Sequence, residues 1–390
     1  MWALVGSYSS DDTPGGLTAF RFDAEAGTLE HVGRADRDLE AGYLVFDPAT
    51  ATLYAVDERK TDGRGPVGPA AAVHAFGFNA STGALAWRNS HVAPGPFPTF
   101  LDYDAGRNLL VSASHGSFDH VERVVQDAAG NWTVEYIYDA STVALYRLAN
   151  AGGIAGLADV VVLDGHGLDP NASPQAGGHA QSTAHAQCAT LDPSGTWLVV
   201  CDKGTDTILT YRMGDRLERA SRYQFPPETA PRHVAFTADS TRMFVTLELA
   251  SGLASMGFDP ETGELTLIDR VSATDGDCGR VNEPAELRLH PNERFVYLNN
   301  RGEDSLAWFS VAPDGTLTRE GHVCVAASIH PGLAARNFMF ATSGRFLLFA
   351  DRPADCIRIY AVDPETGTPT EVGQAPVSQP AYVAIVEDKE

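Results

Sequence analysis

A two-strand unit recurs along this chain and limits the folds that are open to it. The unit reads as an apolar strand, a short polar turn and a second apolar strand, as in Pro231–Glu248, PRHVAFTADSTRMFVTLE. The first turn residue of each copy serves as a marker, and the markers are Asp47, Asp104, Asp192, Thr237, His290 and Ala341. Most markers lie about fifty residues apart, and such a period indicates a repeat architecture.

A second strand pair lies between consecutive copies. Residues 17–32 (LTAFRFDAEAGTLEHV) and 254–271 (ASMGFDPETGELTLIDRV) are examples, each with a glycine-containing turn. The repeating unit is therefore four antiparallel strands. Six units, and a seventh divided between residues 2–32 and 380–388, predict an all-β fold, a seven-bladed β-propeller. The divided unit closes the ring and leaves no edge strand at the chain ends.

The gap between the second and third markers is longer than the others. It holds a segment rich in Ala, Gly and Asp at about 118–178, which we interpret as an insertion in a single propeller domain spanning residues 1–390. Two all-β domains that divide near this segment are the alternative. The same turn chemistry on both sides of the segment favours the single ring.

Charge and cysteine content limit the class of protein. The formal net charge is −23 and the chain has no basic run, so we expect no binding to nucleic acid. Five scattered cysteines without a CxxC pair are typical of buried thiols in a reducing compartment. No leader-like start and no run of roughly 18–20 apolar residues occurs. We therefore expect a cytoplasmic protein with no membrane segment.

Ionisable side chains occupy equivalent places in the repeat. Eleven residues past each marker lie Glu58, His115, Lys203, Glu248, Arg301 and Arg352. Five residues before each marker lie Gly42, Thr99, Gln187, Arg232, Ala285 and Arg336. Hairpin pairing brings the two positions side by side, and the first strand of a propeller blade lines the central channel. Both sets are expected around one channel mouth, with His185 on the same strand face as Gln187.

This clustering has a simpler interpretation. Cross-strand pairs such as Arg232–Glu248 can be plain ion pairs, and the rim of a propeller is polar because its loops are exposed. A functional site predicts instead that Arg232, Glu248 and Arg301 converge in one pocket. A non-catalytic scaffold that binds a ligand or a protein predicts an exposed apolar rim or groove.

Ordered motifs over nearly the whole chain carry a family resemblance. They include GSYS (6–9), LYAVDE (53–58), PRHVAF (231–236), LELASG (247–252) and YLNNRGEDS (297–305). With RNF (336–338) and the repeated DPETG turns, they resemble the lactonase family of seven-bladed propellers. That family includes bacterial 6-phosphogluconolactonase and the fungal carboxy-cis,cis-muconate cyclase. The resemblance implies a carboxylic ester hydrolase that acts on a sugar or sugar-acid lactone.

The resemblance also implies site residues. Arg232, Glu248 and Arg301 match the family's arginine- and glutamate-bearing motifs, and His185 is the first histidine of a His-x-His segment whose second place is Gln187 here. We expect these four to be catalytic: Arg232, Glu248, Arg301 and His185. We expect the substrate to be bound by Gln187, His115, Arg336, Lys203, Glu58 and His233.

Lactone hydrolysis needs a general base, a group that stabilises the oxyanion and a grip on the substrate. Glu248 or His185 is the candidate base, while Arg232 and Arg301 suit the oxyanion and an anionic substituent. The same groups suit closure of a muconate to a lactone, which is the alternative reaction. No cofactor or metal is expected, and His166, His179 and His185 are expected to be solvated in a glycine-rich loop rather than to bind metal.

Overall fold

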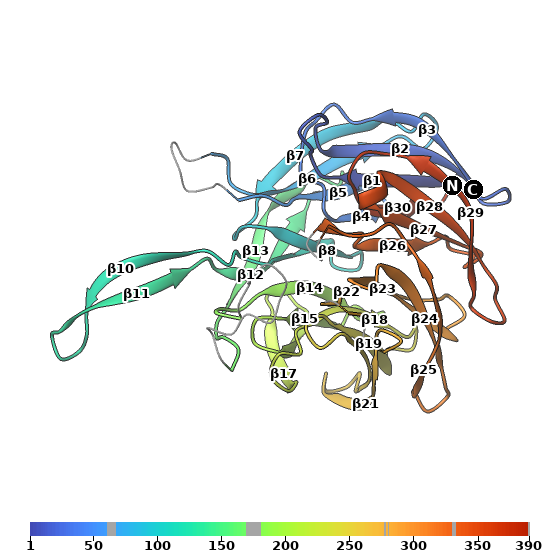
Figure 1. The fold of residues 1–390 in the computed structure, drawn as a ribbon. Coiled ribbons are helices and arrows are strands. Elements are labelled where there is room, and N and C mark those ends of the chain that lie inside the picture. The colour runs from blue at the N-terminus through green and yellow to red at the C-terminus, as the bar shows by residue number, and fades with distance from the viewer. Residues whose placement is uncertain (61–67, 169–180, 277, 280, 330–332, 389–390) are drawn as a thin grey trace.

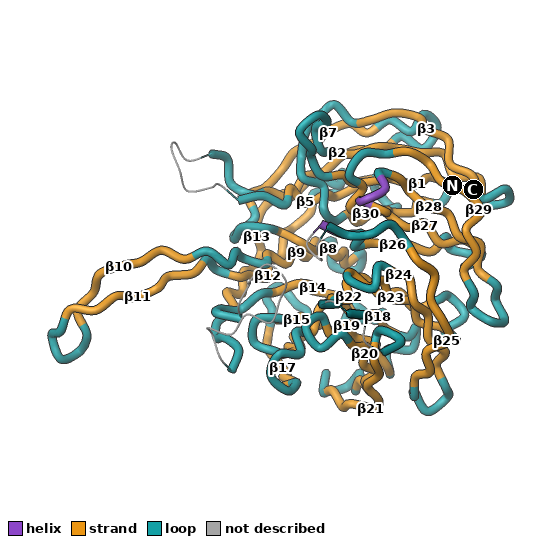
Figure 2. The backbone as a smooth tube through the Cα atoms, in the orientation of Figure 1, coloured by secondary structure: helices purple, strands orange, loops and turns teal. Residues whose placement is uncertain are grey.

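Each copy of the repeat folds into one blade, a four-stranded antiparallel sheet. The computed structural model describes residues 1–60, 68–168, 181–276, 278–279, 281–329 and 333–388. In these residues seven such sheets stand in a ring (Figure 1). The backbone is almost entirely strand and loop (Figure 2), with a 3₁₀ turn, η2, at Arg352–Ala354. The predicted all-β, seven-bladed propeller is confirmed.

The strands follow one another through the blades in chain order, except in the first blade. The first blade consists of β30 (Pro380–Val386), β1 (Trp2–Ser7), β2 (Gly16–Asp23) and β3 (Thr28–Arg34). The second blade consists of β4 (Leu44–Asp47), β5 (Thr52–Asp57), β6 (Ala72–Phe78) and β7 (Leu85–Val92). The third consists of β8 (Pro98–Asp104), β9 (Leu109–Ser114), β12 (Ser141–Leu148) and β13 (Ile154–Leu163).

The remaining four blades lie in the second half of the chain. The fourth blade consists of β14 (Ala186–Leu191), β15 (Trp197–Asp202), β16 (Thr207–Arg212) and β17 (Glu218–Gln224). The fifth consists of β18 (Pro231–Phe236), β19 (Arg242–Leu247), β20 (Gly252–Phe258) and β21 (Leu265–Ser272). The sixth blade consists of β22 (Glu283–Leu289), β23 (Phe295–Arg301), β24 (Ser305–Val311) and β25 (Leu317–Cys324). The seventh consists of β26 (Asn337–Phe340), β27 (Phe346–Asp351), β28 (Cys356–Val362) and β29 (Pro369–Pro376).

The hydrophobic core lies between neighbouring blades. The second strands β5, β9, β15, β23 and β27 are buried along their whole length, because a blade covers each of their two faces. This is why the sequence shows short continuous apolar runs there rather than alternation. The outer strands are mostly exposed. All five cysteines are free, and among the described residues no helix is long and apolar enough to span a membrane.

The two ends of the chain close the ring. Strand β30 is the innermost strand of the first blade and pairs antiparallel with β1, from Trp2 opposite Val386 to Gly6 opposite Tyr382. The termini accordingly lie side by side (Figure 1). Asp388 also contacts the N-terminal ammonium at 2.9 Å and Arg21 at 2.6 Å, but such exposed ion pairs contribute at most about 1 kcal/mol each. The strand pairing therefore provides the closure.

Inner strands of several blades carry a β-bulge near the same channel end. In β18, Arg232 and His233 together lie opposite the single residue Thr246 of β19, whose hydroxyl oxygen accepts the His233 N–H at 2.9 Å. In β22 the register shifts in the same way, and Asn299 Oδ1 accepts the Glu286 N–H at 2.8 Å. A bulge re-aims side chains and is common beside active sites.

The third blade has extra chain in two places, between β9 and β12 and between β13 and β14. Strands β10 (His120–Gln126) and β11 (Trp132–Tyr138) form a separate hairpin that projects from the ring (Figure 1). The predicted insertion at about 118–178 is wrong as a single block, because β12 and β13 within it are blade strands. The β10–β11 hairpin lies between these strands and β9, so it interrupts the spacing of the repeat in the sequence. Residues 169–180 of that block lie outside the described residues.

We predict that a charge in the closing strand opens the ring. Val383 is fully buried opposite Val5, so Val383→Asp places an unpaired carboxylate in the core and should lower the free energy of unfolding by about 3 kcal/mol or more. Val372→Asp on the exposed outer strand β29 is the matched control and should change it by less than about 0.5 kcal/mol. Equal losses in urea unfolding of the two variants would contradict this role of β30.

Candidate active site

A buried carboxylate lies at the centre of the charged cluster. Glu248 directly follows β19, and cations from three blades contact its two oxygens. Lys203 Nζ is 2.8 Å and Arg301 Nη2 is 3.4 Å from Oε1, and Arg232 Nη1 is 2.9 Å from Oε2. The side chains of all four are less than one tenth exposed. The structure thus brings Arg232, Glu248 and Arg301 together, although of the three only Arg232 lines the cavity described below.

The electrostatics of this cluster fix its protonation. Burial alone raises the pKa of Glu248, but Lys203, Arg232 and Arg301 outweigh it and hold the pKa well below its usual range. Burial lowers the pKa of Arg301 to about 10 despite Glu248, and lowers the pKa of Lys203 as well. Glu248 is thus ionised and bonded to cations at any working pH. A carboxylate in this state is a weak proton acceptor, which counts against Glu248 as general base.

A second charged group lies closer to solvent. The Tyr8 hydroxyl donates to Glu58 Oε2 at 2.6 Å and accepts from Arg336 Nη1 at 3.0 Å. The guanidinium groups of Arg336 and Arg352 lie 5.3 and 4.7 Å from the centre of the Tyr8 ring, within cation–π range. The sequence marked the GSYS segment but gave Tyr8 no role. Its place directly after β1, level with the ionisable positions of the other blades, is the signal that identifies it.

Half of the predicted site residues meet in one small cavity on the channel axis. It is lined by Tyr8, Gly42, Tyr43, Glu58, Thr99, Gln187, Arg232, His233, Glu286, Arg336, Asn337, Ala381 and Tyr382. Of the predicted site residues, Glu58, Gln187, Arg232, His233 and Arg336 are therefore brought together. The cavity measures about 20 Å³, which is room for about one water molecule.

Two of the three predicted histidines, His115 and His185, do not line this cavity. The rings of His115 and His185 stack with centroids 4.4 Å apart, and His185 Nδ1 is 3.0 Å from the His115 carbonyl oxygen. Phe118 packs on both rings and lies 5.7 Å from Lys203 Nζ, which joins the pair to the Glu248 cluster. Burial, His185 and Lys203 together hold the pKa of His115 well below its usual range. At neutral pH the His115 ring is an uncharged packing surface.

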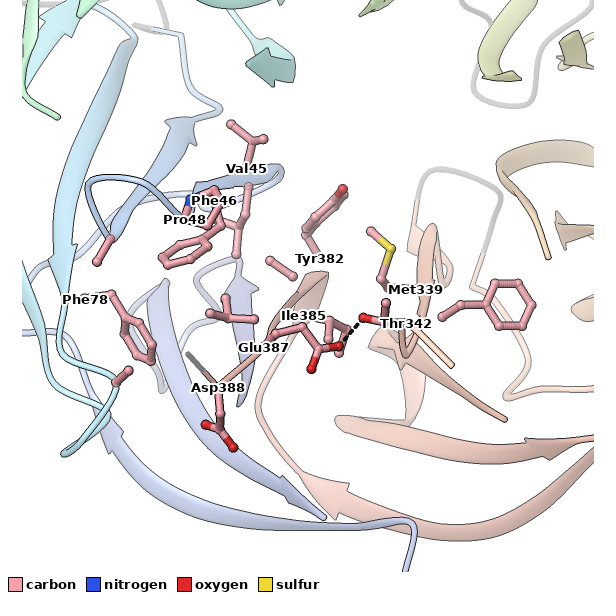
Figure 3. A pocket seen from close by; sticks show the side chains of 16 residues that line it. Val45, Phe46, Pro48, Phe78, Met339, Thr342, Tyr382, Ile385, Glu387 and Asp388 are labelled. Atoms are coloured by element: carbon pink, nitrogen blue, oxygen red, sulfur yellow. Dashed lines mark hydrogen bonds between the residues drawn. The ribbon is translucent and has the colours of Figure 1, made fainter. Parts of the chain in front are cut away.

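An apolar pocket of about 570 Å³ lies elsewhere, between the first, second and seventh blades (Figure 3). Phe46, Phe78, Met339 and Ile385 line it, and it contains none of the predicted site residues. Tyr382 lines both this pocket and the channel cavity, so its ring lies in the wall between them. The polar cavity, not this pocket, contains predicted arginine and histidine side chains.

The described residues contain no group of three or more His, Cys, Asp or Glu side chains that is arranged to hold a metal ion. Of the three loop histidines named from the sequence, His179 lies outside the described residues. His185 is buried rather than solvated, so that expectation is wrong for it, because β14 begins at the next residue and carries it into the ring.

Comparisons with known proteins agree with this architecture. A family model described as lactonase, 7-bladed beta-propeller, matches residues 2–385. The chain is 24% identical over 365 residues to the 6-phosphogluconolactonase of Bacillus subtilis (strain 168), covering 93% of this chain and 91% of the relative. It is 24% identical over 375 residues to a 6-phosphogluconolactonase of Formosa agariphila, covering 93% of each. A solved structure titled periplasmic gluconolactonase, from Pseudomonas aeruginosa, superimposes with a TM-score of 0.81 at 23% identity over 99% of both chains, and shows the same fold.

The low pKa of Glu248 predicts a specific acid dependence of stability. Because the folded-state pKa lies below the unfolded value of about 4.3, Glu248 stabilises the fold above that pH and loses this contribution as pH falls toward the folded pKa. Glu248→Gln should therefore lower stability at pH 7 and flatten its decline below about pH 4. Urea unfolding between pH 3 and 7 measures both effects.

Glu365→Gln is the matched control for this experiment. Glu365 pairs with Arg294 on the surface with its side chain 79% exposed. That variant should follow the unmodified protein over the whole pH range. Curves for Glu248→Gln that run parallel to the unmodified protein below pH 4 would contradict the assignment.

Proposed function

Because the chain belongs to the lactonase family of seven-bladed β-propellers, we propose that it hydrolyses the ring ester of a sugar or sugar-acid lactone, with arginine stabilisation of the oxyanion. Enzymes of this type act on a small molecule. We also propose a cytoplasmic location for the protein.

One observation carries the assignment of the oxyanion site. Arg232 lines the channel cavity, and nothing among the described residues hydrogen-bonds its buried Nε–H. Glu248 holds the other side of the guanidinium in place through Nη1 at 2.9 Å. A fixed cationic donor in the wall of a buried cavity is an arrangement that stabilises negative charge as it develops on a carbonyl oxygen.

The size of the cavity limits how the substrate binds. A volume of about 20 Å³ has no room for a sugar ring, so the lactone lies at the channel mouth and only its carbonyl group reaches Arg232. Arg336 and Arg352 lie at that more exposed level around Tyr8. Two guanidinium groups there suit a phosphate or carboxylate substituent. The two guanidinium groups, together with the name 6-phosphogluconolactonase carried by two relatives, favour an anionic, phosphorylated aldonolactone over a neutral one.

The chemistry requires no group beyond water and these side chains. Water attacks the carbonyl carbon, and the carbonyl electron pair moves to the oxygen beside Arg232. The tetrahedral intermediate then collapses, the ring carbon–oxygen bond breaks, and the ring oxygen leaves as a hydroxyl after it gains a proton. The product is an open-chain hydroxy acid. Closure of a muconate is a different reaction, in which a carboxylate oxygen adds to a carbon–carbon double bond and a carbon atom gains a proton. The assay below therefore tests it separately.

We predict that the purified protein opens 6-phosphogluconolactone faster than the spontaneous reaction and that Arg232 is needed for it. Arg232→Ala should lower kcat by about 10²–10³-fold, because an oxyanion donor is lost. Arg294→Ala, at an exposed arginine on the rim, should leave kcat unchanged. Proton release at constant pH measures turnover, and melting curves confirm that each variant is folded.

Two outcomes would contradict the proposal. Full activity of folded Arg232→Ala would remove this arginine from the oxyanion site. Absence of turnover with every phosphorylated and unphosphorylated aldonolactone would reject lactone hydrolysis. In that case, ring closure of a cis,cis-muconate by the same preparation would identify the cyclase reaction.

A further inference from the structure

A buried histidine in the cavity wall has no role in the scheme above. His233 follows Arg232 in the bulge of β18, lines the channel cavity and is 4% exposed. Thr246 accepts its backbone N–H, and the Tyr43 and Phe100 rings pack edge-on against the imidazole at 6.4 and 5.5 Å. Backbone and ring are thus both held in one position.

A carboxylate from the next blade sets the orientation of this imidazole. Glu286 Oε1 lies 3.1 Å from His233 Nδ1. Asn337 Nδ2 at 2.8 Å and Arg288 Nη2 at 3.2 Å both donate to Glu286 Oε2. Burial alone raises the pKa of Glu286, but Arg288 and His233 lower it to about 2. Glu286 is therefore ionised and can only accept, so the proton of a neutral His233 lies on Nδ1.

This tautomer leaves the other ring nitrogen with a lone pair. His233 Nε2 is buried, and none of the described residues hydrogen-bonds it. The charged or titratable groups around the ring are Glu286 and Arg288 from β22, Arg232 from its own strand and Tyr43, which directly precedes β4. Burial is the largest influence and lowers the pKa of His233, although Glu286 opposes it. The imidazole is neutral at pH 7, which is the state a general base needs.

The cavity has the size and the partners for one water molecule. Its wall contains His233, with an acceptor at Nε2, and Arg232, with a donor at Nε. A cavity of about 20 Å³ with two or more polar partners binds a single water. We propose that His233 is the general base that activates this water, and that Glu286 is the residue that positions His233. The proposal rests on the hydrolase function proposed above and names its base.

The step balances without any further reactant. His233 Nε2 takes one proton from the water as its oxygen bonds to the carbonyl carbon beside Arg232. When the intermediate collapses, the same proton passes from Nε2 to the departing ring oxygen, and His233 returns to its neutral form. The second water proton first remains on the new carboxyl group, which then ionises and releases the proton to solvent. A histidine held by a carboxylate performs this exchange in many hydrolases.

The other candidate bases are less suitable. Glu248 is bonded to Lys203 and Arg232 and is held ionised by them. His185 is stacked on His115 and does not line the cavity. Among the ionisable groups of the cavity wall, only His233 combines a neutral side chain, an available lone pair and a carboxylate that fixes its tautomer.

The test compares His233→Gln with His290→Gln. His290 is a buried histidine at the far end of β22, and both of its ring nitrogens are hydrogen-bonded, to the Gly344 carbonyl oxygen at 3.1 Å and the Asn292 N–H at 3.1 Å. His233→Gln should lower kcat by about 10²–10⁴-fold with KM within about threefold, and imidazole should restore part of the activity to His233→Gly. His290→Gln should lower the melting temperature without changing kcat. A kcat for folded His233→Gln within threefold of the unmodified enzyme would overturn the proposal.

Glu286→Gln tests the positioning role by a pH profile. Glu286 raises the pKa of His233, so its loss should move the acid limb of kcat/KM to lower pH and reduce kcat. An unmoved acid limb would overturn the role of Glu286. A structural role alone would lower the melting temperature and leave the limb in place.

A readout independent of lactone turnover separates this proposal from the proposed function. Histidine nitrogen NMR of the unmodified protein should show one ring, absent from His233→Gln, that is neutral at pH 7 with its proton on Nδ1. An Nε2–H tautomer or a charged ring would overturn the assignment of His233 even if lactones are hydrolysed. An enzyme that opens no lactone but shows the Nδ1–H signal would reject the proposed function and support the dyad.

Discussion

One buried carboxylate makes the channel site physically possible. Lys203, Arg232 and Arg301 come from three neighbouring blades, and three like charges this close repel one another strongly where water is excluded. Glu248 compensates them, and Glu283 lies 3.5 Å from Arg301 on the other side of the cluster. Because the carboxylate binds one edge of the Arg232 guanidinium, the opposite edge faces the cavity. The protein thus maintains a cationic surface inside a chain whose net charge is strongly negative.

The ring geometry determines which side chains reach this cluster. Each blade brings its innermost strand to the same axis, so residues far apart in the chain lie at one level. The bulge in β18 lets two consecutive side chains, Arg232 and His233, line the cavity, where a regular strand would direct one of them into the blade. The bulge in β22 lies beside Glu286, which lines the same cavity. Thr246 and Asn299 hydrogen-bond the backbone N–H groups at these bulges. The site is therefore as rigid as the packing between blades.

The repeat in the sequence was sufficient to predict the fold, because strand alternation and turn chemistry are local signals. It also predicted that Arg232 and Glu248 meet, since hairpin pairing relates two positions within one blade. The shared channel also predicted that Arg301 approaches them from the next blade, but other contacts between blades were not predicted. The pairing of Lys203 with Glu248 depends on how two sheets pack, and Glu286 reaches His233 where bulges shift the register by one residue. The strand pair β12–β13 was missed because the β10–β11 hairpin interrupts the spacing of the repeat.

The closing strand links the site to the synthesis of the chain. Tyr382 lies in β30, lines the channel cavity and accepts a hydrogen bond from Arg288 at 3.0 Å, and Arg288 in turn holds Glu286. Residues 380–386 follow every other blade strand in the chain, yet they complete both the first blade and the wall of the cavity. During synthesis, the other blades can stack before β30 emerges from the ribosome, but the channel is then still open. The wall of the cavity should therefore be complete only once β30 has left the exit tunnel and paired with β1.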